Sequence, residues 1–91
     1  MTAAVLERAW ELAPQVSVRP ERFGALLYHF GTRRLSFLKD PRLLRVVQAL
    51  GDSPSARAAC DEAGVDEGAL PAFERALARL VDTDMLCERV A

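Results

Sequence analysis

Residues 24–38, GALLYHFGTRRLSFL, contain two short runs of strand-forming residues joined by a turn at Gly31 and Thr32. Runs of this kind on either side of a turn predict an antiparallel hairpin. No further strand pattern follows in the chain. The second run is therefore expected at a sheet edge, where a row of backbone N–H and C=O groups has no partner. Such an edge is either a defect or a binding site.

Two other strands are expected beside this edge. Val16 and Val18 alternate with polar residues between two prolines, which predicts a first, short strand. Residues 23–29 have apolar side chains on both faces, a pattern typical of a central strand. In the edge strand, residues 33–38, alternation places Leu35 and Phe37 on one face. Arg34, Ser36 and Leu38 are expected on the other face. The sheet is predicted to be antiparallel.

Helix signals replace strand signals after residue 39. Asp40 stands at an N-cap position and Pro41 fits the first helical position. Gly51 is expected to end this helix in the left-handed conformation. The same scheme repeats with Ser53 as the N-cap of a second helix and Gly64 as its end. Residues 40–64 therefore predict two consecutive helices.

A third helix is expected to start near Leu70, after a separate short turn at residues 65–69. Helical spacing predicts as its buried residues Phe73, Ala76, Leu77, Leu80 and Val81. The whole is an α+β fold, a three-stranded antiparallel sheet followed by three helices, and it is winged-helix-like. Residues 10–91 are expected to form a single domain, preceded by a variable N-terminal segment, residues 1–9.

The charge of the chain is unevenly distributed. The 91 residues carry a formal net charge of -1, which argues against a protein that holds nucleic acid by charge alone. Residues 19–45 nevertheless contain seven basic residues against two acidic ones, whereas residues 53–82 contain six acidic residues against three basic ones. The hairpin side of the domain is therefore expected to be basic.

Few residues could carry catalysis or bind a metal ion. His29 is the only histidine, and no nucleophile or second ligand is spaced to join it, so a local hydrogen bond is its expected role. Cys60 and Cys87 have no other ligand at metal-binding spacing. Neither an enzyme nor a metal or cofactor site is expected. The chain also lacks a signal-peptide pattern and an apolar run of membrane-spanning length, so a cytoplasmic protein without membrane contact is expected.

The last two helices have the spacing of a helix-turn-helix, which raises the alternative of a winged-helix DNA-binding regulator. The third helix would then lie in the DNA major groove. Its segment is net acidic and lacks the Asn, Gln and Lys side chains that read bases and bind phosphates. A protein-interaction subunit that binds through an apolar helix face is a further alternative. Nucleic acid is not the expected partner.

A third class of function uses the open edge. If the edge strand and the third helix border one groove, an extended peptide can add to the sheet as a fourth strand. Which apolar residues face this groove and which face the core stays open from periodicity alone. Four arginines could attract an acidic partner: Arg33, Arg34, Arg75 and Arg79. A proline at Ser36 would test strand addition if the N–H of that residue points outward.

Four segments of the chain carry a family resemblance: ELAPQVSVRP, FGALLYHFGTRRLSFLKD, SARAACDEAGVDE and PAFERALARL. They closely resemble the mycofactocin-system peptide-binding chaperones, a branch of the pyrroloquinoline-quinone-chaperone-like recognition elements for ribosomally made and modified peptides (RiPP recognition elements). The resemblance covers about residues 10–86. The second segment is specific to this branch, whereas the LAP-x-V start is shared by the wider family.

The resemblance implies a non-catalytic chaperone with no cofactor of its own. Such proteins bind the leader of a precursor peptide along the third strand and the third helix, and they present it to a radical SAM maturase in mycofactocin biosynthesis. The iron–sulfur clusters belong to that partner. Carried over to this sequence, the peptide-binding positions are Arg33, Arg34, Leu35, Ser36, Phe37, Leu38, Phe73, Ala76, Leu77 and Leu80.

Overall fold

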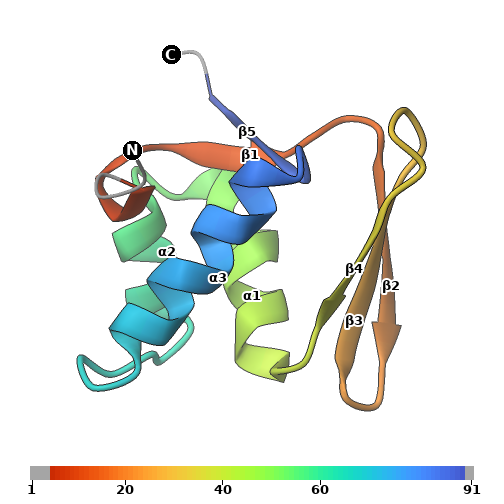
Figure 1. The fold of residues 1–91 in the computed structure, drawn as a ribbon. Coiled ribbons are helices and arrows are strands. Elements are labelled where there is room, and N and C mark those ends of the chain that lie inside the picture. The colour runs from red at the N-terminus through yellow and green to blue at the C-terminus, as the bar shows by residue number, and fades with distance from the viewer. Residues whose placement is uncertain (1–4, 90–91) are drawn as a thin grey trace.

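A layer of helices and a three-stranded antiparallel sheet form the body of the domain (Figure 1). The computed structural model describes residues 5–89. Their elements are η1 (Val5–Glu7), β1 (Trp10–Leu12), β2 (Val16–Glu21), β3 (Gly24–His29), β4 (Leu35–Leu38), α1 (Pro41–Ala49), η2 (Leu50–Asp52), α2 (Ala56–Glu62), α3 (Leu70–Asp82) and β5 (Leu86–Glu88), where η marks a 3-10 turn. The predicted α+β fold is confirmed.

The main sheet has the order β2-β3-β4, with β3 in the centre. The register pairs Val16 with His29 across β2 and β3, and Ala25 with Leu38 across β3 and β4. All three predicted strands are present. β4 begins later than the sequence suggests because Arg33, with φ 63°, belongs to the turn.

A second, two-stranded sheet was not predicted from the sequence. Antiparallel β1 and β5 pair Trp10 with Glu88 and Leu12 with Leu86, so the two ends of the described chain lie side by side (Figure 1). Each strand has three residues, too few for an alternating pattern to be recognised. The indole Nε1 of Trp10 donates a hydrogen bond to the carbonyl of Val5 at 2.9 Å, which holds η1 against β1.

Helix α1 begins as the sequence predicts. The backbone N–H of Arg42 donates to the Asp40 carboxylate at 2.8 Å, and Pro41 occupies the first turn. The hydrogen bonds from the side chain and backbone of Arg42 lower the pKa of the Asp40 carboxyl. The end of the helix differs from the prediction. Gly51 is not left-handed, because the chain continues from α1 into η2 and thereby buries Leu50.

The N-cap of α2 is Ser55, and the prediction of Ser53 was wrong. The hydroxyl of Ser55 accepts a hydrogen bond from the N–H of Ala58 at 3.2 Å. Ser53 is buried instead, and its hydroxyl donates to the carbonyl of Ala49 at 2.8 Å. The predicted end of α2 is confirmed, since Gly64 has φ 82°.

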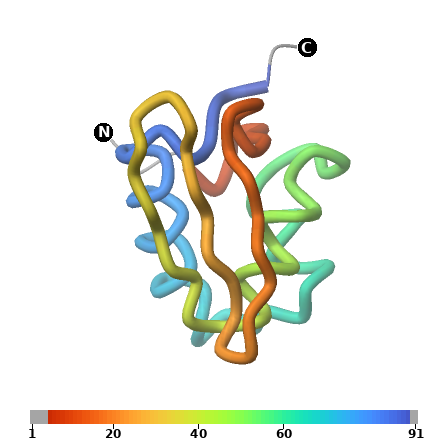
Figure 2. Tube along the Cα trace, turned by 90° about the vertical axis from the view of Figure 1, so that its right-hand side faces the viewer, coloured from red at the N-terminus to blue at the C-terminus, as the bar shows by residue number. Residues whose placement is uncertain are grey.

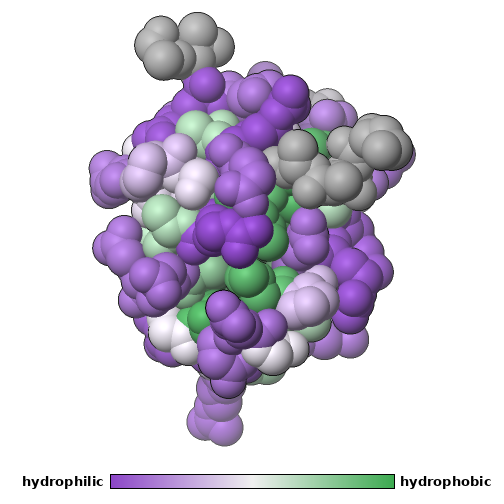
Figure 3. All heavy atoms as spheres, turned by 90° about the vertical axis from the view of Figure 1, so that its left-hand side faces the viewer, coloured by the Kyte–Doolittle hydropathy of each residue, from purple (hydrophilic) through white to green (hydrophobic). Residues whose placement is uncertain are grey.

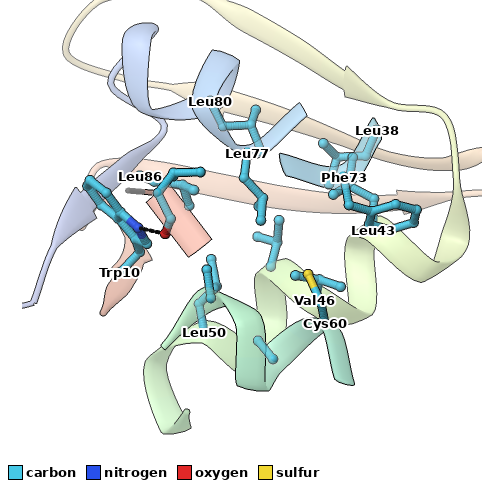
Figure 4. Packing of buried hydrophobic residues seen from close by; sticks show 14 of the residues in the cluster. Trp10, Leu38, Leu43, Val46, Leu50, Cys60, Phe73, Leu77, Leu80 and Leu86 are labelled. Carbon is cyan, nitrogen blue, oxygen red and sulfur yellow. Dashed lines mark hydrogen bonds between the residues drawn. The ribbon is translucent and has the colours of Figure 1, made fainter. Parts of the chain in front are cut away.

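Helix α3 covers the core with the residues that its spacing predicts. Phe73, Leu77 and Leu80 are buried, whereas Ala76 and Val81 are half-buried. Figure 4 shows that Phe73, Leu77 and Leu80 meet residues from β4, α1 and α2 in one cluster. None of the helices within residues 5–89 is long and apolar enough to cross a membrane.

Gly24 permits a close approach between β3 and the segment that joins β4 to α1. Its φ is +148°, a conformation that residues with a Cβ rarely adopt. A Cβ at this position would lie 1.9 Å from the carbonyl oxygen of Leu38. The start of β3 therefore fixes the end of β4, the strand at the edge of the sheet.

We expect Gly24→Ala to lower the free energy of unfolding by about 2 kcal/mol or more, because the substitution adds both backbone strain and a backbone clash. Gly51→Ala is the matched control, because a Cβ there meets nothing within 4 Å. Urea unfolding followed by the fluorescence of Trp10 measures both variants. Equal stability of the two variants would contradict the close approach at Gly24.

Candidate functional site

A groove runs between the edge strand β4 and helix α3. Its volume is about 400 Å³, and its lining residues are Leu35, Ser36, Phe37, Leu38, Leu43, Ala76, Arg79, Leu80 and Thr83. Figure 2 shows β4 beside α3, with β2 at the opposite edge of the sheet. Within residues 5–89, β5 pairs with β1 and no strand pairs with the outer side of β4.

One hydrogen bond establishes which backbone groups of β4 face outward. The N–H of His29 donates to the carbonyl of Arg34 at 3.0 Å, so the carbonyl of Arg34 points toward β3. Successive residues of a strand point their N–H and C=O groups in opposite directions. The groups of Ser36 and Leu38 therefore face β3, whereas those of Leu35 and Phe37 face the groove side. Because the N–H of Ser36 points toward β3, a proline at Ser36 cannot serve as the test of strand addition considered from the sequence.

The opposite edge of the sheet is less able to accept a strand. The N–H of Phe30 donates to the carbonyl of Gln15 at 2.9 Å, so the groups of Val16, Val18 and Pro20 face away from β3. The N–H of Val16 already donates to the carbonyl of Ala13 at 2.9 Å, and proline has no N–H. β4 therefore offers the better template for an added strand.

The side chains of β4 separate as the sequence predicts. Leu38 is buried and Ser36 half-buried, both on the face toward the helices. Leu35 and Phe37 lie on the other face, where 55% and 58% of their surface is exposed. The edge strand thus presents its backbone to the groove and two large apolar side chains to the outer face of the sheet.

Helix α3 supplies the second wall, but only part of the predicted set lines it. Ala76 and Leu80 border the groove, whereas Phe73 and Leu77 are core residues outside its lining. The guanidinium carbon of Arg42 lies 5.2 Å from the centre of the Phe73 ring, which adds a cation–π contact near the start of α3. The role of Phe73 and Leu77 as peptide contacts stays a prediction.

Sequence reasoning missed two lining residues, Leu43 and Thr83. Leu43 is a buried residue of α1, and its position at the groove depends on how α1 packs against β4, which no local sequence pattern indicates. The hydroxyl of Thr83 donates to the carbonyl of Arg79 at 3.0 Å and so satisfies the C-terminal end of α3. A helix-end threonine carries no sequence signal for a groove.

The groove is flanked by positive charge. Arg79 is exposed in the lining, and Arg33 and Arg34 are exposed where the chain enters β4. Among the ion pairs formed within the described residues, none involves these three arginines. Their guanidinium groups are therefore available to an acidic ligand, although Arg33 and Arg34 do not line the groove itself.

His29 has a structural role. Its ring is buried, and Nδ1 accepts hydrogen bonds from the N–H groups of Gly31 and Thr32, each at 3.0 Å. These bonds hold the turn that joins β3 to β4. The expectation that His29 satisfies a local bond is confirmed.

The two thiols have little nucleophilic character. Burial raises the pKa of Cys60, which lies beside a second pocket of about 370 Å³ between α2 and the turn before α3. Desolvation also raises the pKa of Cys87. Residues 5–89 contain no group of three or more His, Cys, Asp or Glu side chains that could hold a metal ion.

Figure 3 shows the face opposite the sheet, where hydrophobic groups lie within a mainly hydrophilic surface.

A family model described as the peptide chaperone MftB family matches residues 9–87. The Peptide chaperone MftB of Mycobacterium tuberculosis is 55% identical over 83 residues, which cover 91% of this chain and 76% of that protein. The Peptide chaperone MftB of Mycobacterium ulcerans is 52% identical over 85 residues, which cover 93% of this chain and 78% of that protein. The Peptide chaperone MftB of Mycolicibacterium smegmatis is 53% identical over 78 residues, which cover 86% of this chain and 76% of that protein. No solved structure matches the chain.

The direction of the β4 backbone can be tested by stability alone. We expect Ser36→Pro to lower the free energy of unfolding by roughly 1–3 kcal/mol more than Phe37→Pro, because it removes a bond to β3 and leaves a buried carbonyl unpaired. Phe37→Pro removes only an outward N–H, which proline on an edge strand tolerates. Urea unfolding compares the two variants. If the Phe37→Pro protein were less stable than the Ser36→Pro protein, the backbone groups of Phe37 and not those of Ser36 would face β3.

Proposed function

The chain belongs to the peptide chaperone MftB family, and we propose that it binds the leader of a ribosomally made precursor peptide by strand addition to β4. We further propose that it acts in the cytoplasm and presents the bound peptide to a radical SAM maturase in mycofactocin biosynthesis. The chain itself performs no chemical step, in agreement with relatives that are named as chaperones.

The observation that carries this proposal is the direction of two backbone units. The N–H and C=O groups of Leu35 and Phe37 face the groove side, two residues apart, as an added strand requires. Main-chain hydrogen bonds at these residues would give affinity without reading the leader's sequence. The bonds at Leu35 and Phe37 would also place the leader alongside α3.

Selectivity would come from the leader's side chains. In an added strand, every second side chain points toward the helices. These side chains would meet Ala76 and Leu80, where the small Ala76 leaves room beside the core. Arg79 lies in the same lining, so a leader with apolar residues and a nearby carboxylate fits the groove best.

Tethering is the proposed mechanism of presentation. A held leader limits the volume in which the far end of the peptide moves, and the effective concentration of that end at a bound enzyme reaches roughly millimolar values for a short flexible connection. Reaction at the maturase would then be favoured without any new contact at its active site. The chaperone needs only to bind the leader and remain close to the enzyme.

We expect Phe37→Pro to weaken leader binding about tenfold more than Phe37→Ala, since only the proline removes an outward N–H and one hydrogen bond contributes about 1–1.5 kcal/mol. Phe37→Ala accounts for the loss of the ring. Titration calorimetry with a synthetic leader gives both affinities. Equal affinities for the two folded variants would count decisively against strand addition.

Charge in the groove gives an independent test. We expect Arg79→Glu to weaken leader binding more than Arg75→Glu, because Arg79 lines the groove and Arg75 does not. Arg75 lies one turn earlier on α3 and is also exposed, so the two substitutions change the net charge of the same helix equally. Calorimetry at two salt concentrations measures the difference. Indistinguishable affinities would remove Arg79 from the site.

A further inference from the structure

The outer face of the main sheet carries an apolar surface that the groove does not use. Within residues 5–89, the large hydrophobic residues that remain exposed are Phe23, Phe30, Leu35 and Phe37. All four lie in or next to the hairpin of β3 and β4, while the helices pack against the opposite face. Among the elements within residues 5–89, none other covers this outer face (Figure 2).

These side chains form one continuous patch. Leu26 is paired with Phe37 and Tyr28 with Leu35, so these four residues share one face of the sheet. The ring centres of Phe23 and Phe37 are 6.1 Å apart, and the rings of Tyr28 and Phe30 meet edge to face at 5.1 Å. The outer patch is defined as Phe23, Leu26, Tyr28, Phe30, Leu35 and Phe37.

The outer patch lies outside the buried core of the domain. Its six residues are absent from the buried core, where Ala25, Leu27 and Leu38 supply the inward side chains of β3 and β4. Large contiguous apolar surfaces are uncommon on small monomeric domains and mark sites of protein interaction. Aromatic residues at such sites often contribute most of the binding energy.

The charges around the outer patch indicate the chemistry of its partner. Arg22 is exposed at the turn next to Phe23, and Arg33 and Arg34 are exposed in the turn next to Phe30. None of the three takes part in an ion pair within residues 5–89. On the β2 side of the same face, Glu21 is paired with Arg19 at 3.2 Å. A second copy laid face to face would therefore bring mainly unpaired arginines together, which disfavours self-association. A surface with carboxylates around an apolar centre is complementary.

We propose that the outer patch docks the partner enzyme of the proposed function, through an enzyme surface that is apolar at its centre and acidic at its rim. The identity of this partner rests on the proposed function, whereas the chemistry of the surface follows from the patch. β4 then serves two ligands at once. Its backbone edge takes the leader, and the outward side chains of Leu35 and Phe37 contact the enzyme.

The test uses residues of the patch that lie outside β4. We expect the double variant Phe23→Ser with Phe30→Ser to bind the purified radical SAM maturase of the same gene cluster at least about tenfold more weakly in surface plasmon resonance. Its affinity for a synthetic leader in calorimetry stays unchanged. Arg79→Glu shows the opposite pattern, with weaker leader binding and unchanged enzyme binding. Urea unfolding confirms that both proteins are folded.

Charge and self-association provide two further measurements. Arg22→Glu weakens enzyme binding, and added salt weakens it in the unaltered protein, because the rim contacts are ionic. Sedimentation velocity shows a monomer for the unaltered protein at the concentrations used. A dimer that the Phe23→Ser, Phe30→Ser variant dissociates would overturn the proposal in favour of a second copy.

The two proposals fail in different ways. If the folded double variant binds the enzyme as tightly as the unaltered protein does, the docking surface is rejected and leader binding stands. If the unaltered protein binds the leader but not the enzyme, the docking surface is again rejected. If the unaltered protein does not bind the leader, the proposed function fails at its first step.

Discussion

The antiparallel pairing of β3 with β4 is the constraint on which the rest of the site depends. It directs the backbone groups of Ser36 and Leu38 inward and leaves those of Leu35 and Phe37 facing the groove side. The same pairing buries Leu38 and turns the side chains of Leu35 and Phe37 to the outer face. A shift of one residue would exchange all of these roles, and the close approach at Gly24 opposes such a shift.

The walls of the groove are extensions of the core. Leu38 and Leu80 are buried residues that also line the groove, and Leu77 packs one turn before Leu80 in the same cluster. Movement of α3 away from β4 would expose this cluster to water at a cost of about 25 cal/mol for each Å² of apolar surface. A peptide that enters the groove therefore meets a largely preformed surface, which lowers the entropic cost of binding.

Local sequence signals predicted the elements that have strong patterns. The alternation in β2 and β4, the cap at Asp40 and the left-handed Gly64 all follow from residues close to one another in the chain. The pairing of β1 with β5 could not be predicted, because it joins two three-residue strands from opposite ends of the chain.

The choice between Ser53 and Ser55 as cap was decided by contacts remote in sequence. The guanidinium group of Arg89 donates hydrogen bonds to the carbonyls of Gly51 and Ser53, which holds that loop against the C-terminal strand.

For the groove, the sequence predicted which two elements meet but not which of their residues are exposed there. The two edges of the sheet also differ in how readily the sheet can be extended: Pro20 interrupts growth beyond β2, whereas β4 contains no proline. Strand addition at both edges of the sheet, which growth of a fibril would need, is therefore disfavoured on the β2 side.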